Sequence, residues 1–150
     1  MSELEYEFLR LWGDENPPIQ NYRFIVEEGI VEGGAGVRAR MRESEYSDWR
    51  MDFAWPDAKV YVEIDGLGGV GGSVGGHRTI TGFLRDIRKH NAATVHGWRL
   101  YRVTTLDIRG NIRTQQKMLN TIRSLIGLQP ISIEETDFVR KINQAIEESV

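Results

Sequence analysis

The chain has 150 residues, of which 40% are hydrophobic and 27% charged, and its formal net charge is −3 at pH 7. This length fits one domain with a single core, so we expect one domain over residues 1–150, with residues 130–150 as a C-terminal helical extension. No apolar run is long enough to cross a membrane, and we expect a soluble, cytoplasmic protein that binds no membrane. The absence of cysteine excludes disulfides and thiolate zinc sites, which makes magnesium or manganese on oxygen ligands the expected metal.

The N-terminal third of the chain predicts one helix and a long irregular stretch. Apolar residues at helical spacing behind a serine N-cap indicate a helix over residues 2–12. Residues 14–36 contain the prolines and glycines typical of a loop, and residues 22–26 are the candidate for a short edge strand.

A β-hairpin is predicted in the middle of the chain. Residues 48–55 and 59–65 are rich in aromatic and β-branched residues and flank a Pro-Asp turn, which indicates two adjacent antiparallel strands. Residues 66–76 then form a glycine-rich loop.

The remaining chain alternates between helix and strand. We expect a helix over residues 79–96, a strand over 98–104, and helices over 111–126 and from about 134 to 148. The first of these helices is indicated by apolar residues at near-helical spacing: Ile80, Phe83, Ile87 and Val95. The predicted order, αβββαβαα, is that of an α/β (α+β) fold with a central mixed sheet flanked by helices and extra C-terminal helices.

Three acidic residues belong to the predicted hairpin. Side chains alternate between the faces of a strand, so Glu63 and Asp65 point to the same side, and Asp52 joins them if the register of the hairpin brings it there. Carboxylates so close raise one another's pKa unless a cation compensates. A divalent metal would supply that charge, and it is what hydrolysis of a phosphodiester requires.

The sequence around these acids resembles a known family. The runs 49–56 (WRMDFAWP) and 59–66 (KVYVEIDG) look like the core of the small PD-(D/E)XK nucleases related to very-short-patch-repair endonucleases. The resemblance continues in order, over roughly residues 5–104, through a set of single positions: Glu5 on the first helix, His77 after the Asp-Gly step, Asp86 with Arg88, and Gly97-Trp98-Arg99.

This resemblance implies a restriction-endonuclease-like αβββαβ core and a Mg²⁺-dependent DNA endonuclease. The metal, Mg²⁺ or Mn²⁺, would be held by Asp52, Glu63, Asp65 and the backbone carbonyl of Ile64, with Glu5 completing the site. The sequence departs from the family signature at Asp65, where a lysine is usual, and in a longer glycine loop. Either a third carboxylate replaces that lysine, or a basic residue arrives from elsewhere, for which Lys89 and His77 are the candidates.

Basic residues are concentrated in the middle of the chain, which predicts DNA as the partner. Between residues 78 and 123 the acids are only Asp86 and Asp107, whereas an ordinary solvated face mixes both signs. We expect DNA contacts from the following residues: Arg78, Arg85, Arg88, Arg99, Arg113 and Lys117.

Other interpretations remain open. The chain could be a nuclease-fold protein that binds DNA or assembles without catalysis, and the glycines at 66, 68 and 71 also match a dinucleotide-binding pattern. His77 could equally be an exposed loop residue, and the last helix could form a homodimer contact or pack on its own domain. No small-molecule cofactor is expected, and the sequence leaves open whether the DNA is branched, nicked or mismatched and whether the setting is repair or recombination.

Overall fold

The computed structural model describes residues 1–67, 79–132 and 137–149, and its centre is a four-stranded mixed sheet with the order β1-β2-β3-β4. Strands β1 (Ile19–Tyr22), β2 (Met51–Trp55) and β3 (Val60–Asp65) are antiparallel neighbours, and β4 (Arg99–Thr104) runs parallel to β3. The predicted α/β class with a central mixed sheet is confirmed at this level.

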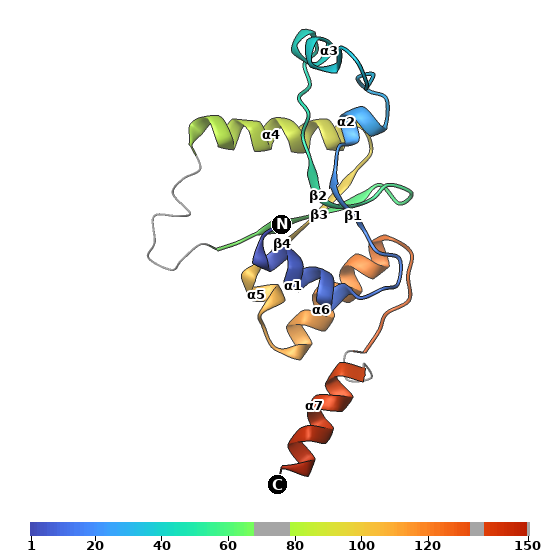
Figure 1. Cartoon of the computed structure of the whole chain (residues 1–150), viewed down its shortest axis with the longest axis vertical. Helices are drawn as coiled ribbons and strands as arrows, with labels where there is room; N and C mark the ends of the chain where they lie inside the picture. Colours follow the sequence, from blue (N-terminus) through green and yellow to red (C-terminus); the bar gives the residue numbers. More distant parts are fainter. Residues whose placement is uncertain (68–78, 133–136, 150) are drawn as a thin grey trace.

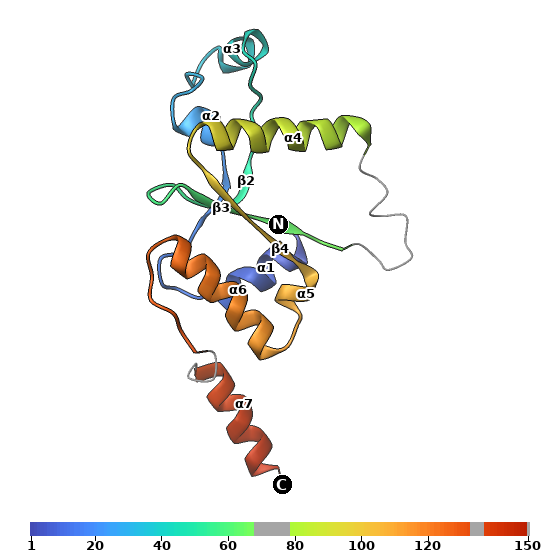
Figure 2. The same ribbon diagram turned by 180° about the vertical axis from the view of Figure 1, so that it is seen from behind.

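Helices cover both faces of the sheet (Figure 1). One face is covered by α1 (Glu3–Trp12), α5 (Thr105–Ile108) and α6 (Ile112–Leu125). The other is covered by α2 (Phe24–Glu27) and α4 (Ile80–Val95). Helices α3 (Val37–Glu43) and α7 (Asp137–Glu148) extend from opposite ends of the molecule, as the reverse view in Figure 2 also shows.

Strand alternation divides the core into two clusters. Val60 and Val62 of β3 pack toward α1 and α6, together with Phe53, Trp55 and Met118. Tyr61 points the other way and joins the cluster under α2 and α4 with Phe24, Ala92, Ala93 and Trp98. Glu63 and Asp65 continue the face of Tyr61, so the acidic side chains lie on the side of the sheet that α4 covers.

The best-predicted helix is α1, because its start is marked by local chemistry. The Ser2 hydroxyl accepts a hydrogen bond from the backbone N–H of Glu5 at 3.2 Å, and the Glu5 carboxylate accepts one from the backbone N–H of Ser2 at 2.6 Å. This reciprocal capping box satisfies two amides that the first turn leaves without partners. Gly13, with φ of 83°, ends the helix as expected.

The prediction for residues 22–26 was wrong. The edge strand lies earlier, at Ile19–Tyr22, where it pairs with β2, and Phe24–Glu27 forms the short helix α2. Phe24 and Ile25 are fully buried in this helix. An aromatic residue followed by a β-branched one is typical of a strand, but here the two side chains pack into the core from a helix. The short helices α3 and α5 were also not predicted.

The longer elements follow the predicted order within a few residues. The hairpin turn lies between Trp55 and Val60, the helix predicted at 79–96 is α4, and the last predicted helix begins by Asp137 among the described residues. Most of the predicted glycine loop, residues 68–76, lies outside the described residues. Among residues 1–67, 79–132 and 137–149, no helix combines the length and apolar character that a membrane crossing requires.

Candidate functional site

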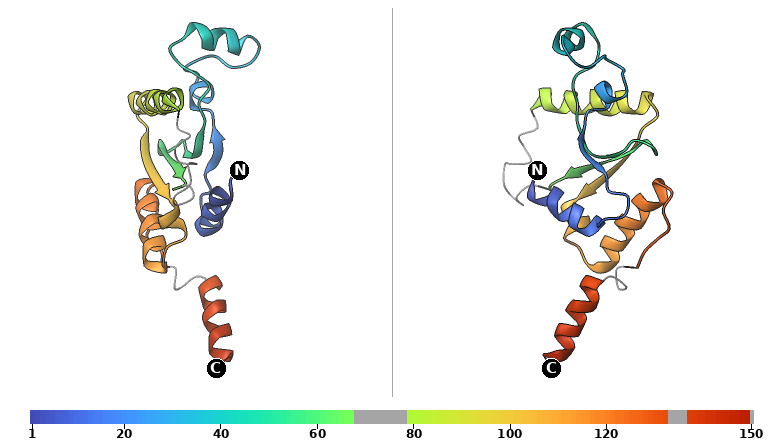
Figure 3. Two further views of the ribbon diagram at one scale, coloured as in Figure 1. Left: turned by 90° about the vertical axis from the view of Figure 1, so that its left-hand side faces the viewer. Right: turned by 45° about the vertical axis from the view of Figure 1, so that its right-hand side comes forward.

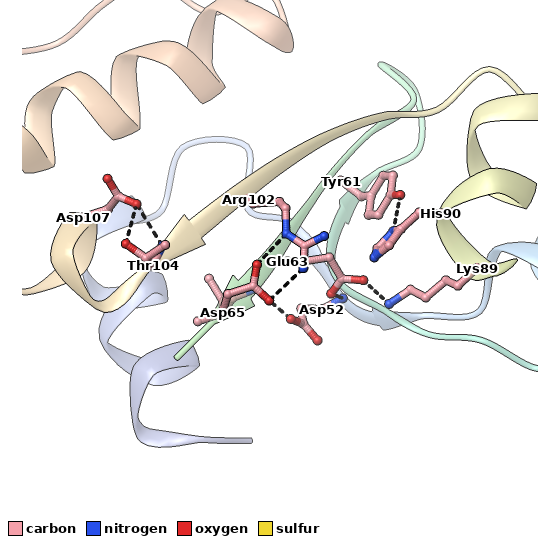
Figure 4. A network of polar contacts seen from close by, with 10 residues as sticks. Asp52, Tyr61, Glu63, Asp65, Lys89, His90, Arg102, Thr104 and Asp107 are labelled. Carbon is pink, nitrogen blue, oxygen red and sulfur yellow. Dashed lines mark hydrogen bonds and ion pairs between the residues drawn. The ribbon is translucent and has the colours of Figure 1, made fainter. Parts of the chain in front are cut away.

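Asp52 and Glu63 face each other across the β2–β3 hairpin (Figure 4). The register pairs Phe53 with Val62, so the next position along brings Asp52 opposite Glu63. The backbone N–H of Ile64 donates to Asp52 Oδ2 at 2.8 Å, and the backbone N–H of Asp52 donates to Glu63 Oε2 at 3.3 Å. Each carboxylate is thus held by the backbone of the opposite strand, and the predicted meeting of these two acids is borne out by the geometry.

Lys89 reaches this pair from α4. Its ammonium forms an ion pair with Glu63 Oε1, and both side chains are nearly buried, with 12% and 8% of their surfaces exposed. Ala92 and Ala93, one turn further along the same helix, are small enough to let α4 lie close to the sheet. The position of Lys89 therefore follows from the packing of α4, and its contact is with the glutamate of the predicted site.

Burial dominates the electrostatics of Glu63. The pKa of its carboxyl is raised to about 8, first by burial, then by the hydrogen bond with Asp52, while the charge of Lys89 acts in the opposite direction. A carboxyl that changes charge near neutral pH beside a second carboxylate and an ammonium is the kind of arrangement found at functional sites. Structural ion pairs can also produce such shifts, so the pKa alone assigns no activity.

Asp65 is paired with a different cation. Arg102 on β4 donates from Nε to Asp65 Oδ2 at 2.6 Å and from a terminal nitrogen to Oδ1 at 3.1 Å. The hydrogen bond and charge of Asp65 raise the pKa of Arg102. Within the described part of the chain, no group of three or more acidic or histidine side chains is arranged to hold a metal ion. The assignments of Asp65 and of the Ile64 carbonyl as metal ligands stay predictions.

Arg102 is a residue of this site that the sequence did not single out. The parallel register pairs it with Glu63, so its side chain emerges on the same face, one strand away. Its signal was a charged residue between Tyr101 and Val103 of the strand, which becomes informative only once the register of β4 against β3 is known.

His90 and Tyr61 form the wall of the site next to Lys89. The Tyr61 hydroxyl and His90 Nδ1 are 2.8 Å apart, and their rings stack with centroids 5.9 Å apart. Burial, followed by the charges of Lys89 and Arg102, lowers the pKa of His90. Burial also raises the pKa of Tyr61. Both groups are therefore neutral near pH 7, and a neutral hydrogen-bonded pair fixes α4 against the sheet beside the ion pair.

Glu5 has a local role at the start of α1. Its carboxylate accepts the capping-box hydrogen bond from Ser2. The first turn of α1 lies near the end of β3, since a Cβ placed on Gly66 would meet Leu4 Cδ1 at 3.4 Å. Glu5 thus lies on a helix that approaches the acidic strand, and its predicted part in catalysis stays untested.

Two predicted positions cannot be placed. His77 and Arg78 lie outside the described residues, as do Gly68 and Gly71 of the dinucleotide-like pattern. That His77 supplies the positive charge usual at position 65 therefore stays a prediction. The other candidate, Lys89, contacts Glu63.

The remaining basic residues predicted to bind DNA are divided between the two faces of the sheet. Arg85 and Arg88 are exposed on α4, the helix that carries Lys89. Arg113 and Lys117 are exposed on α6, which covers the opposite face. Arg99 donates to the backbone carbonyl of Leu125 at 2.8 Å, at the C-terminal end of α6, and so also has a structural partner.

A basic cavity beside α3 was not predicted. It has a volume of about 420 Å³, and its lining includes Arg23, Arg38, Arg42 and Tyr46. Arg40, which lies between Arg38 and Arg42 on α3, instead donates to three backbone carbonyls of residues 32–35 at 2.8–2.9 Å and so fixes the loop before the helix. The available signal was an arginine at every second position from 38 to 42.

Comparisons of the chain with family models, with curated proteins and with solved structures found no match.

Proposed function

We propose that the chain is a metal-dependent DNA endonuclease built on a restriction-endonuclease-like fold. The observation that carries the proposal is the meeting of Asp52 and Glu63 across a hairpin with the buried ammonium of Lys89. Two carboxylates can hold a divalent ion, and one lysine can balance the charge of a phosphate, which together meet the needs of metal-assisted phosphodiester hydrolysis. In this proposal Lys89 supplies, from α4, the positive charge that the family signature places two residues after the glutamate.

The residues present fit a hard divalent ion. Asp52 and Glu63 offer oxygen ligands on one face of the sheet, and the raised pKa of Glu63 indicates that its buried negative charge is incompletely compensated by Lys89. Mg²⁺ or Mn²⁺ would be held by these two carboxylates with the Ile64 carbonyl, and by Asp65 if it exchanges Arg102 for the metal. A bound divalent ion supplies Lewis acidity and lowers the pKa of a bound water.

The protein's own groups would position the DNA and balance its charge. Lys89, now paired with Glu63, would donate to a phosphate oxygen and stabilise the negative charge that builds in the transition state. Arg85 and Arg88 are exposed on the same helix, and Arg38 and Arg42 line the cavity beyond it, so we assign the main contacts with the phosphate backbone to the α4 side of the sheet. Arg113 and Lys117, on α6, would contact a more distant part of the DNA.

A cleavage assay with isosteric variants tests the proposal. Linear, nicked, branched and mismatched DNA would be incubated with Mg²⁺ or Mn²⁺ and with wild type, Asp52→Asn or Lys89→Met. We expect wild type to cleave and the Asp52→Asn and Lys89→Met variants to be inactive. The matched controls Asp57→Asn and Lys141→Met, which change exposed residues of the same types, should cleave like wild type. Cleavage that is independent of metal, or equal in the Asp52→Asn and Lys89→Met variants, would overturn the proposal.

A second candidate is a DNA-binding protein that has kept the nuclease fold without catalysis. It is favoured by the pairing of Glu63 with Lys89 and of Asp65 with Arg102, which balances two of the three carboxylates with internal cations. Calorimetric titration with Mg²⁺ separates the two candidates. The nuclease should bind Mg²⁺ in a way that Asp52→Asn abolishes, whereas the inactive protein should bind only DNA, through Arg85 and Arg88.

A further inference from the structure

The outward face of α4 is apolar. Ile80, Phe83, Leu84 and Ile87, spaced three and four residues apart, are exposed by 81%, 53%, 43% and 41%. The face toward the sheet carries Lys89 and the small Ala92 and Ala93 instead. An amphipathic helix normally turns its apolar stripe to the core, and a contiguous exposed stripe marks a surface that binds a partner. We call these four residues the α4 stripe.

A second apolar helix face lies at the other end of the chain. On α7, Ile142 and Ile146 are one helical turn apart and are exposed by 42% and 58%. Figure 1 and the two side views in Figure 3 show α7 extending away from the sheet and its covering helices. The chain therefore presents two exposed apolar helix faces, the α4 stripe and the face of α7 that carries Ile142 and Ile146.

The two faces belong to opposite sides of one molecule. Ile131, just before α7, is fixed to α6 by two hydrogen bonds with Asn120 at 2.8 and 2.9 Å. The chain from Ser132 to Asp137, five residue steps, spans at most about 18 Å when fully extended. Since α6 and α4 cover opposite faces of the sheet, α7 would have to pass around the sheet within that length to reach its own α4.

We propose that α7 of one copy packs on the α4 stripe of a second copy, and that the exchange is reciprocal. A two-fold axis then gives two identical contacts and a closed dimer. One helix on one helix buries less than the roughly 1,200–2,000 Å² of a stable interface, so the exchange in both directions supplies what a single contact lacks. The arrangement does not depend on the chemistry at Asp52.

Charge favours this pairing over contact between two copies of α4. Arg88, four residues after Leu84, is exposed at the border of the α4 stripe, so packing α4 on α4 brings two arginines toward each other. Glu147 and Glu148 are exposed at the C-terminal end of α7, next to Ile146. In the orientation that brings Glu147 and Glu148 toward Arg88, the exposed Lys141 beside Ile142 lies at the other end of the contact, and this complementarity selects the partner and its orientation.

Complementation between variants tests the pairing. By sedimentation we expect wild type to be dimeric and Phe83→Glu or Ile146→Glu to weaken the dimer about thirtyfold or more, as for interface anchors. Mixing the two variants should give a heterodimer that is tighter than either variant alone but weaker than wild type. It keeps one intact contact, between α7 of the Phe83→Glu chain and α4 of the Ile146→Glu chain, whereas both contacts are damaged when either variant pairs with itself. The control Leu106→Glu, which changes a side chain 68% exposed on α5, should leave the dimer unchanged.

Two results would overturn the proposal. Sedimentation of wild type as a monomer would show that the stripe is not covered by a second copy. If the Ile146→Glu variant stayed dimeric and mixing it with Phe83→Glu did not strengthen association, the dimer contact would lie between two copies of α4 and would not involve α7. Circular dichroism of each variant, matching that of wild type, ensures that a loss of association is not a loss of folding.

The absence of native cysteine allows a direct test of the contact. Leu84→Cys and Ile142→Cys would be made in separate chains, mixed and mildly oxidised. A covalent dimer of the two different chains is expected, at higher yield than a mixture of Ile19→Cys with Ile142→Cys, in which the first cysteine lies on the edge strand. Equal yields, or a chain carrying both cysteines that cross-links only within itself, would contradict the exchange.

Discussion

Burial raises the pKa of Glu63 and the charge of Lys89 lowers it, and the net effect can be measured through the pH dependence of stability. The folded-state pKa of Glu63 is raised from 4.5 to about 8. A raised pKa means that the folded state holds the proton more tightly than the unfolded state. The stabilisation from Glu63 is therefore fully present below pH 4.5 and is lost as the pH rises through about 8. At 1.36 kcal/mol per pKa unit, the loss is roughly 5 kcal/mol.

The perturbation is the double variant Glu63→Gln with Lys89→Met, which removes both charges and nearly keeps the side-chain volumes. Urea unfolding in EDTA at pH 5, 7 and 9 gives the free energy of unfolding of each protein. We expect wild type to lose several kcal/mol relative to the double variant between pH 5 and pH 9, because only wild type carries the titrating carboxyl.

The matched control is Glu43→Gln, which changes an exposed glutamate on α3. Its difference from wild type should stay flat over the same pH range. The opposite result would be a stability of wild type that rises relative to the double variant with increasing pH. That result would mean that Lys89 lowers the pKa of Glu63 by more than burial raises it, and that the pair is a net stabilising ion pair.

Three further predictions follow from the same structure. If Glu63 must be ionised to hold a metal, the Mg²⁺-dependent cleavage rate should rise with pH up to about 8, and a rate that falls over this range would contradict the assignment. Arg102→Met should tighten Mg²⁺ binding in calorimetry if Asp65 is a ligand, and unchanged Mg²⁺ affinity would remove Asp65 from the metal site. The same variant should lower the free energy of unfolding by at most about 1 kcal/mol, because Arg102 is 43% exposed. Ser2→Ala should lower the free energy of unfolding by about 1 kcal/mol in urea, since α1 loses the hydroxyl of its capping box, and no loss would show that the cap frays in solution.

Elements with strong local signals could be predicted from the sequence. The capping box of α1, the Pro-Asp turn of the hairpin and Gly97 after α4 each mark a boundary through residues a few positions apart. By contrast, β1 has three exposed residues out of four and almost no alternation, so it becomes a strand only because β2 offers it a pairing edge. That information lies some thirty residues away in the sequence and has no local counterpart.

The residues of the candidate site likewise divide into those that local sequence could place and those that depend on distant parts of the chain. Asp52 and Glu63 could be brought together from the hairpin alone, because a short turn fixes which residues lie opposite each other. Arg102 could not, since its place beside Glu63 depends on the parallel register of β4, which is entered from α4 rather than from a turn. Lys89 was one of two candidates, and its contact with Glu63 depends on how α4 is rotated about its own axis.

That rotation is the least predictable feature of the chain, and it connects the site to the α4 stripe. The spacing of Ile80, Phe83 and Ile87 correctly predicted a helix, but these residues face away from the sheet. Turning them inward would place apolar side chains against Asp52 and Glu63 and move Lys89 into solvent, leaving a buried carboxyl without its cation.

The polar contacts of the inner face, Lys89 with Glu63 and His90 with Tyr61, therefore fix the orientation of α4. Because they fix it with the apolar stripe outward, the helix gains little hydrophobic burial within its own chain. A helix committed to a charged site on one side needs its apolar side covered by another molecule, and α7 of a second copy is the segment of this chain suited to do so.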